Sequence, residues 1–430
     1  MMRGRRGFGS MRFRAYARAL IATVCLVATV ACSAERAEQS EAPVGNLSLV
    51  STLGGLDTVG YERATEIRHF VFPEDHGPHP GFRTEWWYIT GNLTSDEGRD
   101  FGFQFTIFRS SLAPTEPGGP SAWATNQAYM GHFAVTDIDG DAFKAADLFA
   151  RGSGGLAGAE TTPLRVWIED WVLESAAVGA GEGATAPLGA PGVARSTDAS
   201  ASVFPLRLAA DGDGFGLELL LEAGKPHVLQ GDRGLSQKGA EPGNASYYYA
   251  HTRMPASGRV VFDGEEHTVT GLTWMDREWS TSALSEGQVG WDWFALQLDD
   301  GWEMMVYQLR LEDGSADPLS DGVLIDPQGN RVPLEWGSEV VVEPTGAWAS
   351  PEDGAEYPSG WRIRVPDRGW DLTVDPVVDD QELRLAFRYW EGSVAVEGVG
   401  EGGAAVNGRG YVELTGYAGF GAQEPLGSTP

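Results

Sequence analysis

The stretch Gly271–Arg310, GLTWMDREWSTSALSEGQVGWDWFALQLDDGWEMMVYQLR, decides the fold that the sequence predicts. It holds five of the fifteen tryptophans of the chain, interleaved with acidic and basic residues. From Trp291 to Leu309, apolar and polar residues alternate on either side of Asp299-Asp300-Gly301, a pattern that is typical of a β-hairpin. Aromatic and ionisable side chains are therefore expected to share one face of a sheet or its rim.

A second stretch of the chain has the same pattern. Glu85–Thr94 and Phe101–Arg109 alternate on either side of a turn at Ser95–Arg99. A third strand follows each hairpin, at Phe133–Gly140 after the first and at Gly322–Gly329 after the second. Three strands in the same order at two places indicate duplication of an all-β unit, although short amphipathic strands can also resemble one another by chance.

The composition favours antiparallel β structure along the whole chain. There are 430 residues and 58 glycines, few runs of helix-forming residues, and many short alternating segments separated by Gly, Asp and Pro. This length suits two domains with full cores. The polar, glycine-bearing segment Leu229–Asn244 predicts a boundary, so we expect two tandem all-β barrel or sandwich units at residues 61–243 and 244–430.

The N-terminus predicts an exported protein. Residues 1–32 begin with an arginine-rich segment without acids, continue as an apolar run and end at Cys32, which is the layout of a secretory signal peptide. Thr29–Cys32 resembles a bacterial lipobox, in which the cysteine is lipidated; cleavage without lipidation is the alternative. Residues 33–60 are small and polar and are expected to form a tether. We therefore expect a lipoprotein of the bacterial cell envelope that faces the periplasm.

Cysteine usage and charge exclude several functions. Both cysteines, Cys25 and Cys32, lie in the leader, so the mature chain is expected to have neither a disulfide nor a cysteine nucleophile. The formal net charge is −30, which argues against nucleic acid or anionic lipid as a partner, because such binding depends on Lys and Arg. Solubility or a salty habitat also accounts for the charge.

Patterns for metal binding and serine hydrolysis are weak. His69, His76 and His79 lie with Asp75 in a Pro-rich loop, where their spacing does not fix the rings toward one point. We therefore expect no metal and no other cofactor, and interpret the loop as one held by histidine hydrogen bonds. The sequence contains no G-x-S-x-G, so hydrolysis is the weakest enzyme hypothesis.

Five motifs carry a resemblance to a known family. They are F-P-E-D-H-G-P-H-P at 72–80, E-W-W-Y-I-T-G at 85–91, Y-Y-Y-A-H-T-R-M at 247–254, T-W-M-D-R-E-W-S at 273–280 and G-W-D-W-F-A-L-Q-L-D-D-G at 290–301. The sequence resembles the AttH-like, carotenoid 1,2-hydratase (CrtC) group of lipocalin-like proteins, whose exported members are often labelled predicted hydrolases. The resemblance implies two lipocalin-like β units packed side by side, with an apolar pocket in or between them.

The resemblance also implies a ligand class and a candidate acid. The family includes fungal pericyclases that fold long polyenes without a cofactor, so a long hydrophobic ligand is its common feature. In the hydratases an Asp within an aromatic-x-Asp motif protonates a terminal alkene, and Trp274-Met275-Asp276 matches that position. This chain has Tyr247–Tyr249 and His251 where the hydratases have His and Trp, a departure that argues against a carotenoid as the substrate.

Asp276 is therefore the candidate proton donor. Burial near tryptophans would raise its pKa and keep it protonated, and the faces of Trp274 or Trp279 could stabilise a carbocation by about 1–2 kcal/mol. A salt bridge to Arg277 or Arg253 would instead lower the pKa of Asp276 and make it structural. The expected binding residues are mostly aromatic side chains, which in a barrel can equally belong to the core: Trp274, Trp279, Tyr249, His251, Trp291, Trp293, Trp87 and Glu85.

Two functions remain open at this stage, apart from hydrolysis. The first is a carrier of a hydrophobic small molecule or lipid, held at the membrane by a lipid on Cys32 and serving envelope transport, with an ABC-type transporter as a partner. The second is a cofactor-independent hydratase or isomerase of an alkene ligand. An Asp276 that lines an apolar cavity without an arginine partner favours the enzyme, whereas a salt-bridged Asp276 favours the carrier. For Glu85, a buried ion pair with an arginine is the alternative to a binding role.

Overall fold

The computed structural model describes residues 58–119, 121, 123–176, 202–282, 284–285 and 287–418. The predicted leader with Cys32 and nearly all of the predicted tether lie outside the described residues. The described residues form three antiparallel sheets, and their only helical elements with defined bounds are the short 3₁₀ segments Glu74–His76, Pro366–Arg368 and Glu401–Gly403, which confirms the all-β prediction. No helix among them is long and apolar enough to cross a membrane.

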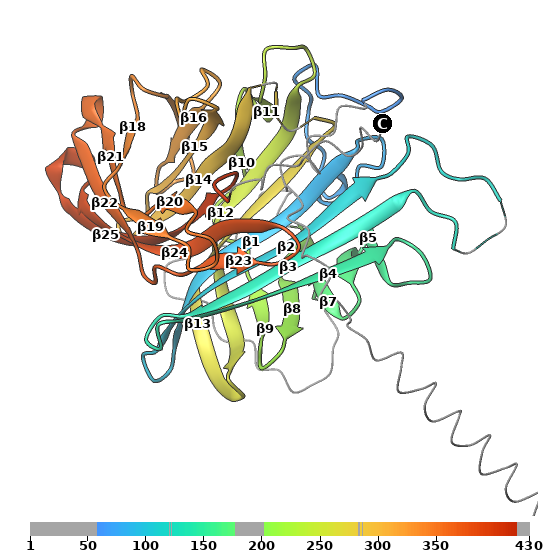
Figure 1. The fold of residues 1–430 in the computed structure, drawn as a ribbon, viewed down its shortest axis with the longest axis horizontal. Coiled ribbons are helices and arrows are strands. Elements are labelled where there is room, and N and C mark those ends of the chain that lie inside the picture. Colours follow the sequence, from blue (N-terminus) through green and yellow to red (C-terminus); the bar gives the residue numbers. More distant parts are fainter. Residues whose placement is uncertain are drawn as a thin grey trace, which may run out of the picture. The chain divides into compact units, whose positions relative to one another are not determined.

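The first sheet has 13 strands and closes almost completely into a barrel (Figure 1). Its strands are β1 (Thr84–Ser95), β2 (Asp100–Ser111), β3 (Gln127–Asp137), β4 (Ala142–Arg151), β5 (Ala157–Thr161), β6 (Leu164–Ile168), β7 (Trp171–Ser175), β8 (Leu206–Gly212), β9 (Phe215–Leu221), β10 (Val228–Leu229), β11 (Leu235–Gln237), β12 (Ala245–Phe262) and β13 (Glu265–Ser280). Neighbouring strands follow the order β4-β3-β2-β1-β13-β12-β9-β8-β7-β6-β5, and β10 and β11 pair with β12.

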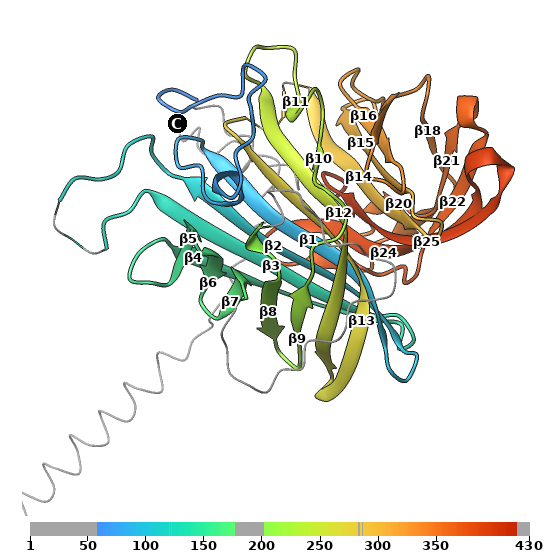
Figure 2. The same ribbon diagram turned by 180° about the vertical axis from the view of Figure 1, so that it is seen from behind.

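The second sheet has 10 strands and forms a half-barrel, drawn in orange to red in Figures 1 and 2. Its strands are β14 (Gln288–Leu298), β15 (Glu303–Leu311), β16 (Asp321–Ile325), β17 (Arg331–Glu335), β18 (Val341–Pro344), β21 (Trp361–Val365), β22 (Trp370–Pro376), β23 (Glu382–Arg384), β24 (Arg388–Val399) and β25 (Ala405–Leu414). The order is β17-β16-β15-β14-β25-β24-β22-β21-β18, with β23 on β24. A small third sheet pairs β19 (Ala347–Ala349) with β20 (Glu356–Pro358).

Both predicted hairpins are present. In β1 and β2, Glu85 lies opposite Arg109, and in β14 and β15, Trp291 lies opposite Leu309. The second hairpin turns at Gly301, whose φ of 90° is a left-handed conformation that favours glycine. The alternation of apolar and polar residues therefore predicted these strands and their connections correctly.

The two sheets repeat one strand order. In each, the first three strands follow one another, and the last strand pairs with the first, β13 with β1 and β25 with β14. This agrees with two lipocalin-like units made from a repeated module. The change of sheet falls between Ser280 and Gln288, however, because β12 and β13 pair into the first sheet. Strands β12 and β13 come after residue 244, where the boundary was expected, yet they belong to the first sheet. The polar segment before residue 244 is therefore a loop within the first unit and not a link between the two units.

The hydrophobic core has a part in each sheet and a part between them. One buried cluster that includes Phe103, Val166 and Leu208 fills the first barrel, and another that includes Leu296 and Trp361 fills the concave side of the half-barrel. A third joins side chains of both sheets, and the Asn92 side-chain amide on β1 donates to the Gly410 carbonyl on β25 at 3.2 Å. Strands β1 and β13 of the first sheet are therefore buried on both faces.

Candidate functional site

Strand β13 presents two different faces. Trp274, Asp276, Glu278 and Ser280 point away from the barrel, because side chains two residues apart share a face. The residues between them, Met275 and Trp279 among them, point into the barrel core. Two buried carboxyl groups therefore lie on the outer face of the barrel, where the second sheet covers them.

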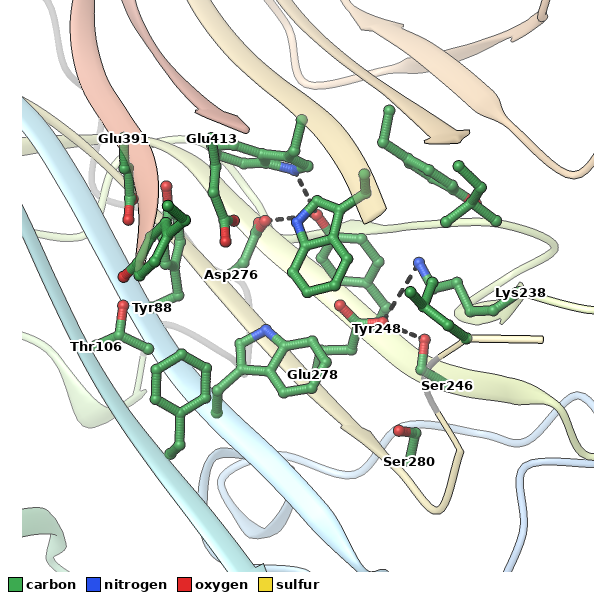
Figure 3. Close-up of a pocket in the computed structure, with 18 of the residues that line it drawn as sticks. Tyr88, Thr106, Lys238, Ser246, Tyr248, Asp276, Glu278, Ser280, Glu391 and Glu413 are labelled. Atoms are coloured by element: carbon green, nitrogen blue, oxygen red, sulfur yellow. Dashed lines mark hydrogen bonds and ion pairs between the residues drawn. The ribbon is translucent and has the colours of Figure 1, made fainter. Parts of the chain in front are cut away.

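A cavity lies between this outer face and the second sheet (Figure 3). Strands β1, β2, β12 and β13 form one wall, and β14, β15, β24 and β25 form the other. Its volume of about 90 Å³ is smaller than the roughly 150 Å³ of an engineered cavity that binds benzene in another protein. Eight aromatic side chains line it: Trp86, Tyr88, Phe108, Tyr248, Trp291, Trp293, Tyr307 and Tyr389.

Asp276 is held in this wall by aromatic donors. The Tyr248 hydroxyl donates to its Oδ2 at 2.5 Å (Figure 3). The Trp274 indole N–H donates to its Oδ1 at 2.6 Å. The Trp293 indole N–H in turn donates to the Tyr248 hydroxyl oxygen at 3.3 Å. Asp276 is only 4% exposed, and it forms no ion pair with a Lys or Arg of the described residues.

Burial dominates the acidity of Asp276. It raises the pKa of Asp276 to about 8, although the hydrogen bonds from Tyr248 and Trp274 act in the opposite direction. Most Asp276 side chains are therefore protonated at neutral pH. The carboxyl group can then donate a proton into the cavity, which a carboxylate cannot do.

The arginines that could have neutralised Asp276 have other partners. Arg277 lies on the opposite face of β13, where it pairs with Glu85, and Arg253 pairs with Glu303. Burial acts to raise the pKa of Glu85, but Arg277 and Arg109 outweigh it and hold that pKa well below its ordinary value. The alternative interpretation of Glu85 as a buried ion-pair partner is thus confirmed.

The histidine-bearing loop belongs to the same charged end of the barrel. His76 Nδ1 and the Tyr249 hydroxyl share a hydrogen bond of 2.6 Å, and His79 lies 3.1 Å from Asp75 and 3.2 Å from Glu85. Histidine hydrogen bonds therefore hold the loop, as predicted. Within the described ranges, no group of three or more His, Cys, Asp or Glu side chains is placed to hold a metal ion.

The structure brings together only some of the predicted site residues. Trp291 and Trp293 line the cavity, and Trp274 contacts the carboxyl group of Asp276. The others lie on the opposite face of the first sheet, in the barrel core or at its charged end: Trp279, Tyr249, His251, Trp87 and Glu85. Trp279, for example, stacks on His79 with ring centroids 3.8 Å apart. Of the residues expected to bind a ligand, these five therefore do not line this cavity.

Several ionisable groups of the cavity were not among the predicted residues. Lys238 lies in the loop after β11, with its Nζ 3.4 Å from Glu278 Oε1. Burial acts to lower the pKa of Lys238, but Glu278 and neighbouring groups outweigh it and raise that pKa above its ordinary value. Glu391 and Glu413 face the cavity from the second sheet. Strand alternation could have revealed Tyr248 beside the chosen Tyr249, since only one of two successive side chains can share the face of Asp276.

The fold defines the class: all-β, lipocalin-like proteins built of two sheets. Within it, this chain belongs to the AttH-like family, whose sequence profile matches residues 63–417. A protein assigned as AttH from Nitrosomonas europaea is 32% identical, has a TM-score of 0.67, and the alignment covers 83% of this chain and 99% of that one.

A solved structure of much lower sequence identity has the same fold. Kievitone hydratase from Nectria haematococca is 14% identical, with a TM-score of 0.58 and coverage of 84% of this chain and 97% of that one. At this identity the likeness concerns the fold alone. No protein of curated function matches the sequence.

Proposed function

We propose that this protein holds an apolar, alkene-bearing ligand in the inter-sheet cavity and that Asp276 starts a cofactor-independent hydration or isomerisation by protonating it. The observation that carries the proposal is the environment of Asp276, a buried carboxyl group with two neutral aromatic donors and no ion pair to a Lys or Arg of the described residues. A hydratase shares the fold.

The cavity supplies what such a reaction needs after protonation. A proton added to one alkene carbon leaves a carbocation on the other. Trp293 and Tyr88 meet edge to face, with centroids 5.1 Å apart, beside Asp276, and the π face of a ring stabilises a nearby cation by about 1–2 kcal/mol when water is excluded. The aromatic lining therefore favours the charged intermediate over its dissociation into solvent.

The size of the cavity limits the part of the ligand that it encloses. A volume of about 90 Å³ is too small for a whole long isoprenoid or polyene. We therefore expect the cavity to take the alkene-bearing end of the ligand, with the remainder passing out along the sheets. A ligand with a trisubstituted alkene at one end is the preferred class, because it gives a tertiary carbocation.

Replacement of Asp276 by asparagine tests the proposal. Asn keeps the shape and an oxygen acceptor but has no acidic proton, so conversion of an alkene ligand should fall by about 10²–10⁴-fold while the dissociation constant changes little. The ligand is first sought by mass spectrometry of lipids extracted from the purified protein, and turnover is then followed by chromatography.

Asp292→Asn is the matched control. Asp292 is also a buried aspartate, but it lies on the concave side of the second sheet and bonds to Arg310 at 2.8 Å, so this variant should retain turnover. Full turnover by Asp276→Asn would refute the role of Asp276. Tight binding without conversion by the wild-type protein would favour the second candidate, a carrier, which the eight aromatic lining side chains also suit.

Export and lipid anchoring belong to the same proposal, because the sequence pattern at Cys32 supports them. Wild-type protein made in bacteria with radiolabelled palmitate should carry the label and fractionate with membranes. Cys32→Ser should lose the label while the folded domain remains intact by circular dichroism. Equal labelling of both forms, or of neither, would exclude lipidation at Cys32.

A further inference from the structure

The wall of the cavity opposite Asp276 contains two glutamates in direct register. Glu391 on β24 and Glu413 on β25 are Cα partners in the antiparallel ladder, so both side chains extend from the same face. Side chains in such a pair have Cβ atoms about 4.5–5.5 Å apart. Both face the cavity, and neither forms an ion pair with a Lys or Arg in the described part of the chain.

Like charges directly opposite one another are unfavourable even on an exposed sheet, and more so in a low-dielectric site. Burial and the neighbouring Glu413 raise the pKa of Glu391 well above its ordinary value, and burial raises the pKa of Glu413 to about 7. Two carboxyl groups so close titrate as a pair, which loses its first proton much more readily than its second. At neutral pH the pair can therefore hold one proton and still accept another.

Unsatisfied polar atoms surround this pair. Within the part of the chain that the structure describes, both carboxyl oxygens of Glu391 are buried without a hydrogen-bond partner, and so is the hydroxyl of Tyr88. The phenols of Tyr88 and Tyr389 lie beside Glu391 but do not reach hydrogen-bond geometry with it. Buried polar atoms in native proteins are almost always satisfied by protein, ligand or water. Their grouping at a cavity wall points to a water molecule or ligand oxygen at this place.

Tyr88 connects the pair with Asp276. On β1 it is the Cα partner of Asp276 on β13. The negative charges of Asp276, Glu391 and Glu413 all act to raise the pKa of Tyr88, after burial, so the four groups lie close together. Figure 3 shows these four side chains at one end of the cavity, while Lys238, Ser246 and Ser280 lie at the other. Among the described residues, the other charged groups that line the cavity are Glu278 of β13, whose charge acts on Glu413, and its partner Lys238 at the far end.

We propose that Glu391 and Glu413 form a carboxyl dyad that accepts a proton from the attacking water and returns it to Asp276. This inference rests on the proposed function, which assigns only the proton donor. It adds the general base, the position of the water and the route by which Asp276 is reprotonated.

The steps balance without a further reactant. Asp276 gives its proton to one alkene carbon, so a C–H bond forms and the π bond breaks. The oxygen of a water held at Glu391 then bonds to the cationic carbon, and one proton of that water passes to the ionised member of the dyad. The dyad finally transfers a proton to the Asp276 carboxylate through Tyr88 or a second water. The net change is alkene plus water to alcohol, and the protein returns to its starting state.

The test separates alkene protonation from water addition. Geraniol, a short isoprenoid alcohol with trisubstituted double bonds, is incubated with the protein in D₂O, and both alcohol formation and deuterium in the recovered alkene are measured by mass spectrometry. Glu391→Gln and Glu413→Gln should lower alcohol formation by about 10²-fold or more, the usual contribution of a general base. Deuterium exchange should continue in both, because Asp276 can still protonate the alkene and take the proton back.

Three further variants make the outcomes distinct. Asp276→Asn should lose both readouts, Glu397→Gln, at an exposed position of the same strand, should keep both, and Glu391→Asp should recover part of the alcohol formation. If the two Gln variants keep alcohol formation while Asp276→Asn loses it, the dyad is refuted and the proposed function stands. If Asp276→Asn keeps both readouts, or the wild-type protein gives neither, the proposed function fails and the dyad with it.

A measurement without substrate tests the pairing itself. The infrared C=O band of buried protonated carboxyl groups is followed against pH in the wild-type protein and in Glu413→Gln. Removing the like-charged neighbour should lower the pH at which the Glu391 band disappears. An unchanged titration of this band would mean that the two glutamates do not share protons, which would overturn the dyad.

Discussion

At the scale of a single residue, the partners of a buried carboxyl group decide what it can do. Asp276 and Glu85 are both almost fully buried, and burial acts to raise both pKa values. Glu85 contacts two guanidinium groups, which reverse the effect of burial, whereas Asp276 contacts a phenol and an indole, which do not. One side chain is therefore a permanent anion that stabilises the barrel, and the other is an acid that can give up a proton near neutral pH.

Tyr248→Phe should shift the pH dependence of the reaction. The Tyr248 hydroxyl stabilises the ionised form of Asp276, so its removal should raise the pKa of Asp276 above its present value of about 8. Activity that needs the protonated acid would then persist to higher pH, by about 0.5–1 pH unit, the equivalent of one hydrogen bond. The measurement is kcat/KM against pH.

Tyr249→Phe is the control for this shift, because Tyr249 faces the barrel core and its hydroxyl bonds to His76. It should leave the alkaline limb of the profile in place. An alkaline limb that moves to lower pH in Tyr248→Phe, or moves equally in both variants, would contradict the assignment of that limb to Asp276.

At the scale of the secondary-structure element, β13 joins two sites of opposite character. Its inward face carries Arg277, which with Glu85 of β1 and Arg109 of β2 ties three adjacent strands together inside the barrel. Its outward face carries Asp276 in the cavity. These ion pairs hold β13 in place and so position Asp276. Because successive side chains of a strand point to opposite faces, the charges of the ion pairs lie on the face of the sheet opposite Asp276.

Glu85→Gln should strongly destabilise the barrel. The change leaves the guanidinium groups of Arg109 and Arg277 buried without a counter-charge, which costs about 3–5 kcal/mol in urea unfolding at pH 7. Because the folded-state pKa of Glu85 is depressed, this stabilisation is complete above the ordinary glutamate pKa of 4.5 and is lost as pH falls through the folded value. The difference between the two proteins should therefore shrink in acid.

Glu218→Gln provides the comparison for an ion pair on the surface. Glu218 also contacts two arginines, Arg207 and Arg259, but all three side chains are more than a third exposed, so its loss should cost at most about 1 kcal/mol. If Glu85→Gln lost no more stability than Glu218→Gln, the buried network would not be holding β1, β2 and β13 together.

The same strand shows how far the sequence could predict the site. Alternation and turn residues predicted both hairpins and their repeated order, because these signals are local. The face of each side chain was harder to assign, since β1 and β13 are apolar on both sides and hydrophobicity cannot distinguish barrel core from inter-sheet cavity. Trp274 and Trp279 are nevertheless an odd number of residues apart, so regular alternation places them on opposite faces. Glu391 and Glu413 could not be joined to Asp276 without the packing of the sheets.

At the scale of the whole molecule, the cavity exists because two repeated sheets pack through their outer faces. Each sheet fills its own concave side with a hydrophobic cluster. The surface between the sheets is thus the place where polar groups from both can meet, and four carboxyl groups do so there. Neither unit alone would bury them, so the acid and the dyad proposed to serve it depend on both copies of the module.

This arrangement predicts that the folded protein loses stability as pH rises toward 8. Burial raises the pKa of Asp276 to about 8 and that of Glu413 to about 7, so between pH 5 and pH 8 the folded state binds protons that the unfolded state has released. The free energy of unfolding therefore decreases with pH in this window, by several kcal/mol if both groups retain these values. Acidic groups with depressed pKa values, such as Glu85, act only below this range. Burial lowers the pKa of His132 from 6.5 to about 3, so this histidine opposes the trend up to about pH 6.5, and the decrease is clearest between pH 7 and pH 8.

Urea unfolding at pH 5, 6, 7 and 8 measures the effect, with salt at about 0.5 M so that the formal net charge of −30 is largely screened. Asp276→Asn and Glu413→Gln should each flatten the pH dependence and be more stable than the wild-type protein at pH 8, since they remove a proton-linked cost of folding. A wild-type protein whose stability rises from pH 5 to pH 8 would show that these carboxyl groups ionise freely. The cavity would then be wetter and more polar than a site for carbocation chemistry can be.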